Sequence, residues 1–226
     1  MSPVARRMTQ VALSIVASAA ILLGTAGRLD WGWAWAYVGL AASFVLLTAV
    51  LLLPTRRDLI AERAGAGEGA KTWDKWLGGA ATAVGSLVAL VVAGLDARLG
   101  WTQALPARTH LLGAACFLAG YGLFTWAMAS NPFFSTIVRI QKDRGHTVVD
   151  TGPYRAVRHP GYVGWIVSAL ATPVLLGSSW ALVPAALGSC LMVARTALED
   201  RTLRRELPGF ADYAVRVRYR LLPWVW

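Results

Sequence analysis

Long apolar runs without charged residues alternate with short polar segments along this chain. The first four runs cover residues 8–27, 31–55, 76–95 and 111–129. At about 1.5 Å per residue, each can cross a hydrocarbon core roughly 30 Å thick as an α-helix. The first run follows Arg6 and Arg7 and is longer than the usual core of a signal peptide, so we interpret it as a retained membrane span. The pattern predicts a membrane helix at each of the four runs.

The last apolar run differs from the others in length. Residues 160–194 contain no charged side chain, and as one helix they would extend about 52 Å, too far for an ordinary span. Gly177, Ser178 and Ser179 near the middle favour a turn. We therefore predict a tight helical hairpin with arms at 162–176 and 180–194. The second arm is expected to continue through 195–207 and to end at Pro208 and Gly209.

The fold class that follows is an all-α integral membrane protein. We predict one multi-span helical bundle of about five to six membrane helices, the last two forming the tight hairpin. Residues 1–226 form a single membrane domain, with N-terminal transmembrane helices at 1–130 and a catalytic half at 131–226. Hydrophobic residues make up 56% of the chain and charged residues 15%, which excludes an ordinary soluble domain.

The basic residues are distributed very unevenly over the loops. The formal net charge is +10, and nineteen of the 22 lysines and arginines fall on one side of the spans. Only Arg28, Arg98 and Arg108 fall on the other side. The positive-inside rule then places both termini, and any site among these loops, in the cytosol. Because topology explains the excess of positive charge, we expect no nucleic acid partner. The location expected is the cytoplasmic or inner membrane, or an endomembrane.

Cys116 and Cys190 lie in separate apolar runs, without a CxxC pair or a nearby histidine. This pattern argues against a disulfide framework and against a zinc site. We expect no bound metal.

A polar segment at 141–164 carries the candidate chemistry. It reads QKDRGHTVVDTGPYRAVRHPGYVG and lies between two apolar regions on the expected cytosolic side. Arg155, Arg158 and His159 offer donors to an anion, and the rings of Tyr154 and Tyr162 attract cations. Glu199 adds a negative charge nearby. This mixture suits a zwitterion such as the amino-acid part of S-adenosylmethionine, and no glycine-rich strand-to-helix motif indicates a soluble-type nucleotide fold.

Three motifs in this half resemble one known family. They are HTVVDTGPYRAVRHPGYVGW at 146–165, RTALED at 195–200 and FADYAVRVRYRLLP at 210–223. Together they look like the isoprenylcysteine carboxyl methyltransferase family, which belongs with the phospholipid methyltransferases among integral membrane methyltransferases. The N-terminal spans are similar only in kind. The chain departs from the family pattern at Asp200, where a second glutamate is usual.

The resemblance implies S-adenosyl-L-methionine as the cofactor and assigns residues to it. By resemblance Arg195 handles the substrate, and Glu199 is the acidic ligand of the cofactor. The positions that correspond to cofactor contacts are Gln141, His146, Thr147, Val148, Val149, Tyr154, His159, Pro160, Gly161, Tyr162 and Glu199.

The spacing of the two charged candidates fits one site. Arg195 and Glu199 are four residues apart and therefore share a helix face. An arginine at the end of an apolar helix often only extends its charge toward water. Combined with the RHPGY run upstream, a functional role is favoured.

The function predicted is methyl transfer to a lipophilic acceptor that enters from the bilayer, resembling protein-S-isoprenylcysteine O-methyltransferase. Phospholipid N-methylation and thiol S-methylation stay open, because the motifs follow the cofactor and not the acceptor. A membrane reductase or a non-enzymatic membrane protein are further alternatives. Surrounding membrane lipids are expected partners of the basic tail.

Overall fold

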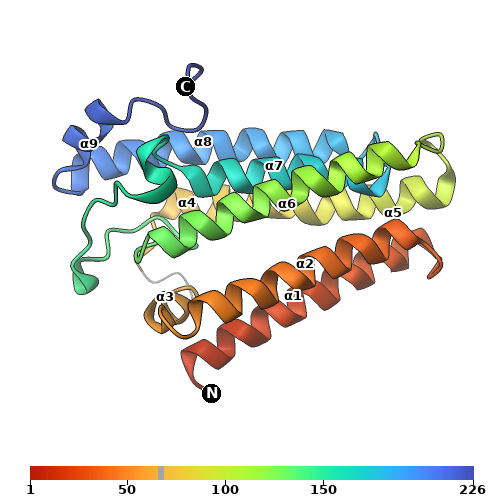
Figure 1. Cartoon of the computed structure of the whole chain (residues 1–226), viewed down its shortest axis with the longest axis horizontal. Helices are drawn as coiled ribbons and strands as arrows, with labels where there is room; N and C mark the ends of the chain where they lie inside the picture. The colour runs from red at the N-terminus through yellow and green to blue at the C-terminus, as the bar shows by residue number, and fades with distance from the viewer. Residues whose placement is uncertain (66–68) are drawn as a thin grey trace.

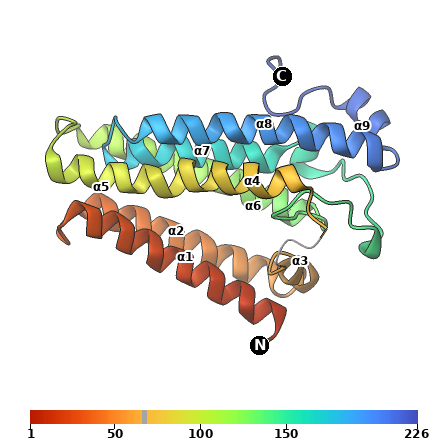
Figure 2. The ribbon, with the colours of Figure 1, turned by 180° about the vertical axis from the view of Figure 1, so that it is seen from behind.

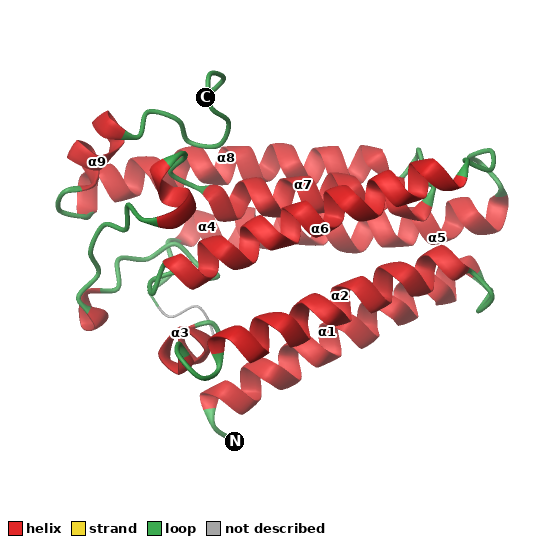
Figure 3. Cartoon of the chain, in the orientation of Figure 1, coloured by secondary structure: helices red, strands yellow, loops and turns green. Residues whose placement is uncertain are grey.

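The computed structural model covers the whole chain and describes every residue except 66–68. The described residues contain helices and loops and no strand (Figure 3). The long helices are α1 (Pro3–Ala26), α2 (Gly32–Leu52), α4 (Thr72–Thr82), α5 (Ala89–Leu99), α6 (Ala107–Ser130), α7 (Pro160–Leu176) and α8 (Leu182–Glu206). The short elements are α3 (Arg57–Glu62), the π-helical η1 (Ala83–Val88), the 3₁₀ turns η2 (Lys142–Arg144) and η3 (Gly152–Arg155), and α9 (Phe210–Arg216).

Among the described residues, five helices are long and apolar enough to cross a membrane, which confirms the predicted fold class. One of them runs without a break from Thr72 to Leu99, through α4, η1 and α5. The shorter α7 has 17 residues and pairs with α8 through the predicted turn, where Gly177 adopts the left-handed region at φ 77°. Helix α1 begins at Pro3 and not at residue 8, because Ser2 caps its first turn by accepting a hydrogen bond from the Ala5 N–H at 3.2 Å.

Glycines let the inner helices approach closely. A Cβ on Gly120 of α6 would lie 2.7 Å from the Gly164 carbonyl oxygen of α7. A Cβ on Gly188 of α8 would lie 2.3 Å from the Gly85 Cα in η1. Small residues at such contacts are the usual way in which membrane helices pack backbone against backbone. Figure 2 shows the resulting bundle from behind, with α4, α5 and α8 along one side.

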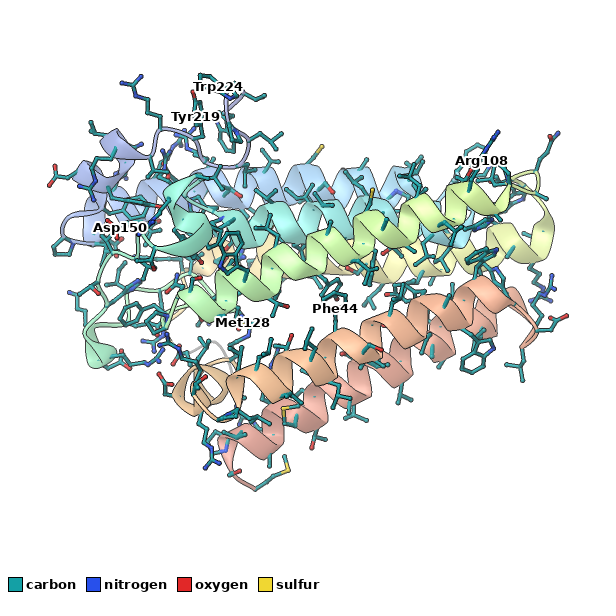
Figure 4. All side chains as sticks on the ribbon, in the orientation of Figure 1. Phe44, Arg108, Met128, Asp150, Tyr219 and Trp224 are labelled. Carbon is teal, nitrogen blue, oxygen red and sulfur yellow. The ribbon has the colours of Figure 1, made fainter. Side chains whose placement is uncertain are left out.

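The α1–α2 hairpin lies outside this bundle. In Figure 1 the end of the hairpin that carries the α1–α2 loop lies beside α5. Toward the end of the molecule where both termini lie, the hairpin diverges from α6. The same end carries α3, the segment between α6 and α7, and α9. We call it the basic end. Figure 4 marks Asp150 at the basic end and Arg108 at the opposite end.

Candidate functional site

A cavity opens at the basic end between the segment that follows α6, the start of α7, the end of α8 and α9. Ten of the eleven cofactor positions inferred by resemblance line it. They are Gln141, His146, Thr147, Val148, Val149, Tyr154, His159, Gly161, Tyr162 and Glu199. Residues far apart in the sequence therefore face one space.

Three predicted residues, Pro160, Arg195 and Arg155, do not line this cavity. Pro160 is buried at the first turn of α7, where its fixed φ suits the helix start. Arg195 lies behind Tyr162, which does line the cavity. The expected anion donor Arg155 is exposed and is not part of the lining either. Arg158, the other arginine expected to bind an anion, lines the cavity, but its N–H groups donate to other parts of the chain, as described below.

Backbone contacts hold the start of α7 in place. The Arg158 and His159 N–H groups donate to the carbonyls of Tyr219 and Arg220 in the C-terminal tail, both at 2.9 Å. Gly161 has no side chain because the Phe134 ring occupies that space: a Cβ there would lie 2.5 Å from Phe134 Cε2. Glycine at position 161 therefore lets the Phe134 ring, which lines the cavity, pack directly against α7.

A chain of polar side chains connects the cavity to α4. The Tyr162 hydroxyl donates to Glu199 Oε2 and accepts from Arg195 Nη1 at 2.5 Å. The Arg195 guanidinium lies 5.0 Å from the centre of the Tyr162 ring, and its Nε donates to Asp74 Oδ1 at 2.6 Å. Arg195 is 5% exposed and Asp74 2% exposed. The buried arginine is therefore neutralised by an acid from the N-terminal half.

Asp74 has a second partner that orders the cavity wall. Its Oδ2 accepts the Val138 N–H at 2.6 Å. Arg195 Nη2 donates to the Thr136 carbonyl at 3.1 Å in the same segment. The Asp74–Arg195 pair thus connects the middle of α8 to the segment that follows α6.

Asp200 anchors a second network beneath the site. It is fully buried and accepts from Arg158 at 2.6 Å, Arg204 at 3.0 Å and Arg220 at 3.1 Å. Arg158 also donates to the carbonyls of Val217 and Arg218, at 2.7 Å each. Since its donors are used in this way, Arg158 serves the architecture of the site, and the aspartate at 200 has a structural role.

The 141–149 stretch is held by an amide and an imidazole. Gln141 is buried, donates from Nε2 to the Phe133 carbonyl at 2.8 Å, and accepts from Arg144 at 2.5 Å. His146 stacks on Phe133 with ring centroids 4.5 Å apart, and its Nδ1 accepts the Gln141 N–H at 3.3 Å. Burial, then the charges of Arg139 and Arg144, lower the pKa of His146 to about 4. The imidazole is neutral at physiological pH, as acceptance at Nδ1 requires.

Aromatic residues shape the remaining wall. The Tyr154 hydroxyl accepts from Asn131 Nδ2 at 3.2 Å, and its carbonyl accepts from the Tyr213 hydroxyl at 2.7 Å. Burial raises the pKa of Tyr154, so its ring presents a neutral face to the cavity. Phe210 of α9 completes this wall.

Sequence reasoning missed Asp74, Asp200 and Phe134. Asp74 comes just before the third apolar run and looks like an ordinary interfacial charge. Asp200 was noted only as a departure from the family pattern. A usable signal existed for Asp74: an acid at the border of a span demands a cationic partner, and Arg195 stands at the matching depth of another span.

The fold and the site define a multi-pass membrane protein with a polar, aromatic-walled cavity at the basic end of its bundle. A model of the isoprenylcysteine carboxyl methyltransferase (ICMT) family matches residues 112–205. This match and the relatives below show that this region of the chain is similar to that family.

Relatives named protein-S-isoprenylcysteine O-methyltransferase occur in several organisms. That of Schizosaccharomyces pombe is 38% identical over 71 residues, covering 31% of this chain and 30% of the relative. That of Xenopus laevis is 43% identical over 80 residues, covering 35% and 28%. That of Dictyostelium discoideum is 30% identical over 93 residues, covering 39% of each chain. The similarity thus spans less than half the length of these relatives, and Asp74 and the N-terminal hairpin precede the region of the family match.

Proposed function

We propose that this chain is an S-adenosyl-L-methionine-dependent methyltransferase that acts on a lipophilic acceptor, with carboxyl methylation of an isoprenylcysteine as the favoured reaction. The observation that carries the proposal is the single cavity lined by Glu199, Tyr162, His159 and the 146–149 stretch, directly beside the buried Arg195. The family match and the names of the relatives support the reaction type.

The residues present suit S-adenosyl-L-methionine. Its adenine and sulfonium favour aromatic faces, and Phe133, Phe134, Tyr154 and Tyr162 supply them. Its positively charged groups suit Glu199. The buried His159 Nε2 has no hydrogen-bond partner among the described residues and lies 3.5 Å from Asp200 Oδ1. A buried polar atom without a partner indicates that the site is completed by a ligand.

When bound, S-adenosyl-L-methionine would supply a methyl group on a positively charged sulfur, for transfer to an acceptor carboxylate with a neutral thioether as the leaving group. The chain's task is then alignment, because a carboxylate is already deprotonated and needs no general base. Three of the five Arg195 N–H groups are used by Asp74, Tyr162 and the Thr136 carbonyl. The other two are available to orient the acceptor anion. The aromatic wall and the half-buried Tyr162 would exclude water from the reacting groups.

The orientation in the membrane belongs to the same proposal. Nineteen of the 22 basic residues lie on the side of the termini and the cavity, so we place this end in the cytosol. The donor would enter from the cytosol and the acceptor laterally from the bilayer. Reporter fusions or cysteine accessibility at Asp150 and at Arg108 test this placement, and labelling of Asp150→Cys from the non-cytosolic side would contradict it.

Calorimetric binding of S-adenosyl-L-methionine to the purified protein tests the cofactor. Glu199→Gln should weaken binding by about tenfold or more, since a desolvated charge contact of this kind is worth roughly 1.5–3 kcal/mol. Glu206→Gln on the same helix is the matched control, because Glu206 pairs with Lys71 at the surface. Equal affinity for the Glu199→Gln variant and the control contradicts the role of Glu199.

A screen of acceptors with methyl-labelled donor tests the reaction. A prenylated cysteine with a free carboxylate should be methylated, and Arg195→Ala should abolish turnover while donor binding is retained. Methylation of a phospholipid amine or of a small thiol instead would change the acceptor assignment. Nicotinamide-dependent reduction, or no donor binding at all, would refute the methyltransferase proposal.

A further inference from the structure

We call the cavity lined by Tyr162 and Glu199 the donor cavity, because we propose that the methyl donor binds there. A second cavity lies between the α1–α2 hairpin and α6. We call it the hairpin groove. Its walls come from α1, α2, the end of α3 and α6, and most of its lining residues are apolar. The lining comprises Arg7, Met8, Val11, Ser14, Ile15, Ser18, Tyr37, Val38, Ala41, Phe44, Val45, Thr48, Ala49, Leu52, Ile60, Arg63, Tyr121, Phe124 and Met128. Figure 4 shows Phe44 on the side of α2 that faces α6.

Aromatic rings separate this groove from the donor cavity. Phe124 lines the groove and Phe134 lines the donor cavity, and the two rings meet edge to face with centroids 5.2 Å apart. The guanidinium of Arg63 lies over both rings, at 5.9 Å from the Phe124 centroid and 5.2 Å from that of Phe134. Arg63 therefore lies at the boundary between the groove and the donor cavity.

Two arginines, Arg7 and Arg63, line the basic end of the groove. Arg139, Arg144, Arg158 and Arg195 are each paired with an acid. Within the described part of the chain, neither Arg7 nor Arg63 has a carboxylate within ion-pair distance.

The charge of Arg7 acts directly on Arg63. Burial, and then the charge of Arg7, lower the pKa of Arg63. Two cations placed together at the border of an apolar groove are unfavourable unless an anion joins them.

We propose that the hairpin groove binds an anionic phospholipid of the leaflet at the basic end, with its phosphate between Arg7 and Arg63 and an acyl chain along the groove. A phosphodiester matches the guanidinium donors, which bind phosphate oxygens bidentately. The wall from Arg7 to Ser18 is roughly 17 Å of helix, enough for most of an acyl chain. The lipid fills the space where the hairpin diverges from α6 and holds the two parts together.

Exchange into nanodiscs tests this, with phosphatidylglycerol compared with phosphatidylcholine and retained lipid counted by native mass spectrometry. Wild type should retain phosphatidylglycerol selectively. The Arg7→Gln/Arg63→Gln variant should lose this retention about tenfold or more. The matched control is Arg57→Gln/Arg205→Gln, which removes two exposed arginines at the same end and should retain the lipid as wild type does.

A second variant leaves both arginines in place. Ala41→Trp puts a large side chain into the middle of the groove and should displace the acyl chain, lowering retention as well. Equal retention in all variants, or no preference for the anionic lipid, would overturn the proposal. So would competition for the groove by a prenylated cysteine, which would make it the acceptor site. Because these experiments measure lipid retention and not turnover, they test lipid binding even if the methyltransferase proposal fails.

Discussion

Substituting Gly78 tests whether the position of Arg195 limits turnover. Gly78 lies on α4, one turn after Asp74. A Cβ at position 78 would lie 3.1 Å from Arg195 Nε, 3.5 Å from its Cζ and 3.7 Å from its Cδ. The nearest of these atoms is the Nε that donates to Asp74 at 2.6 Å. Ordinary van der Waals contact begins at about 3.4 Å, so Gly78→Ala must push the guanidinium by a few tenths of an ångström.

The expected magnitude follows from that shift. A misplacement of 1 Å can cost about 100-fold in rate, so a shift of about 0.3–0.5 Å corresponds to roughly a four- to tenfold loss of kcat. The affinity for S-adenosyl-L-methionine should change little, because Arg195 does not line the donor cavity. The assay is methyl transfer at saturating donor with the acceptor found in the screen, together with calorimetry of donor binding.

Gly79→Ala is the matched control. A Cβ at 79 meets no atom within 4 Å, and both substitutions raise helix propensity by about 1 kcal/mol. A difference between the two variants therefore reports the contact with Arg195 alone. Equal kcat in Gly78→Ala and Gly79→Ala would refute the claim that alignment of Arg195 limits the reaction.

Three further predictions concern stability and protonation. Asp200→Asn leaves the buried Arg158 without its counter-charge and should cost about 3–5 kcal/mol, seen as a lower midpoint of thermal unfolding in detergent; an unchanged midpoint would contradict it. NMR should show His146 titrating near pH 4. Since the folded-state pKa lies below that of an unfolded histidine, the contribution of His146 to stability is complete above about pH 6.5 and is lost as the pH falls toward 4. Titration of His146 near pH 6.5 would contradict this prediction. Gly120→Ala, whose Cβ would lie 2.4 Å from Ser168 Oγ, should destabilise by about 1–3 kcal/mol, whereas Gly122→Ala meets nothing within 4 Å and should not; equal losses would show that close packing is not the cause.

The membrane helices were predictable because their signal is local. An uncharged run of about 20 residues must become a helix in hydrocarbon, so each predicted span has its counterpart and even the hairpin turn at Gly177 falls where expected. Boundaries at the basic end were less well predicted. Helix α1 extends back over Arg6 and Arg7. The cap at Ser2 stabilises its first turn, and the long arginine side chains can reach water from there.

The site was predictable only in part, for a different reason. Similarity to a family brought together residues from 141–162 and 199, and they do share one cavity. Their roles stay predictions. Similarity could not reveal what neutralises Arg195, because Asp74 lies 121 residues earlier and before the region of the family match. Helix periodicity says which face a residue is on, but not which distant helix that face meets.

Residues before and after position 130 form ion pairs and hydrogen bonds with one another, so the N-terminal helices contribute directly to the site. The proposed boundary between N-terminal helices and a catalytic half stays a prediction, yet the catalytic half alone lacks essential partners. Asp74 supplies the carboxylate for Arg195 and the acceptor for the Val138 N–H, and Glu62 binds Arg139 through both carboxylate oxygens at 2.9 Å. Without these acids, the buried Arg195 would lose its counter-charge, and the cavity-lining Arg139 would keep Asp143 as its one acidic partner among the described residues. The N-terminal spans are therefore part of the site's electrostatics as well as its membrane anchor.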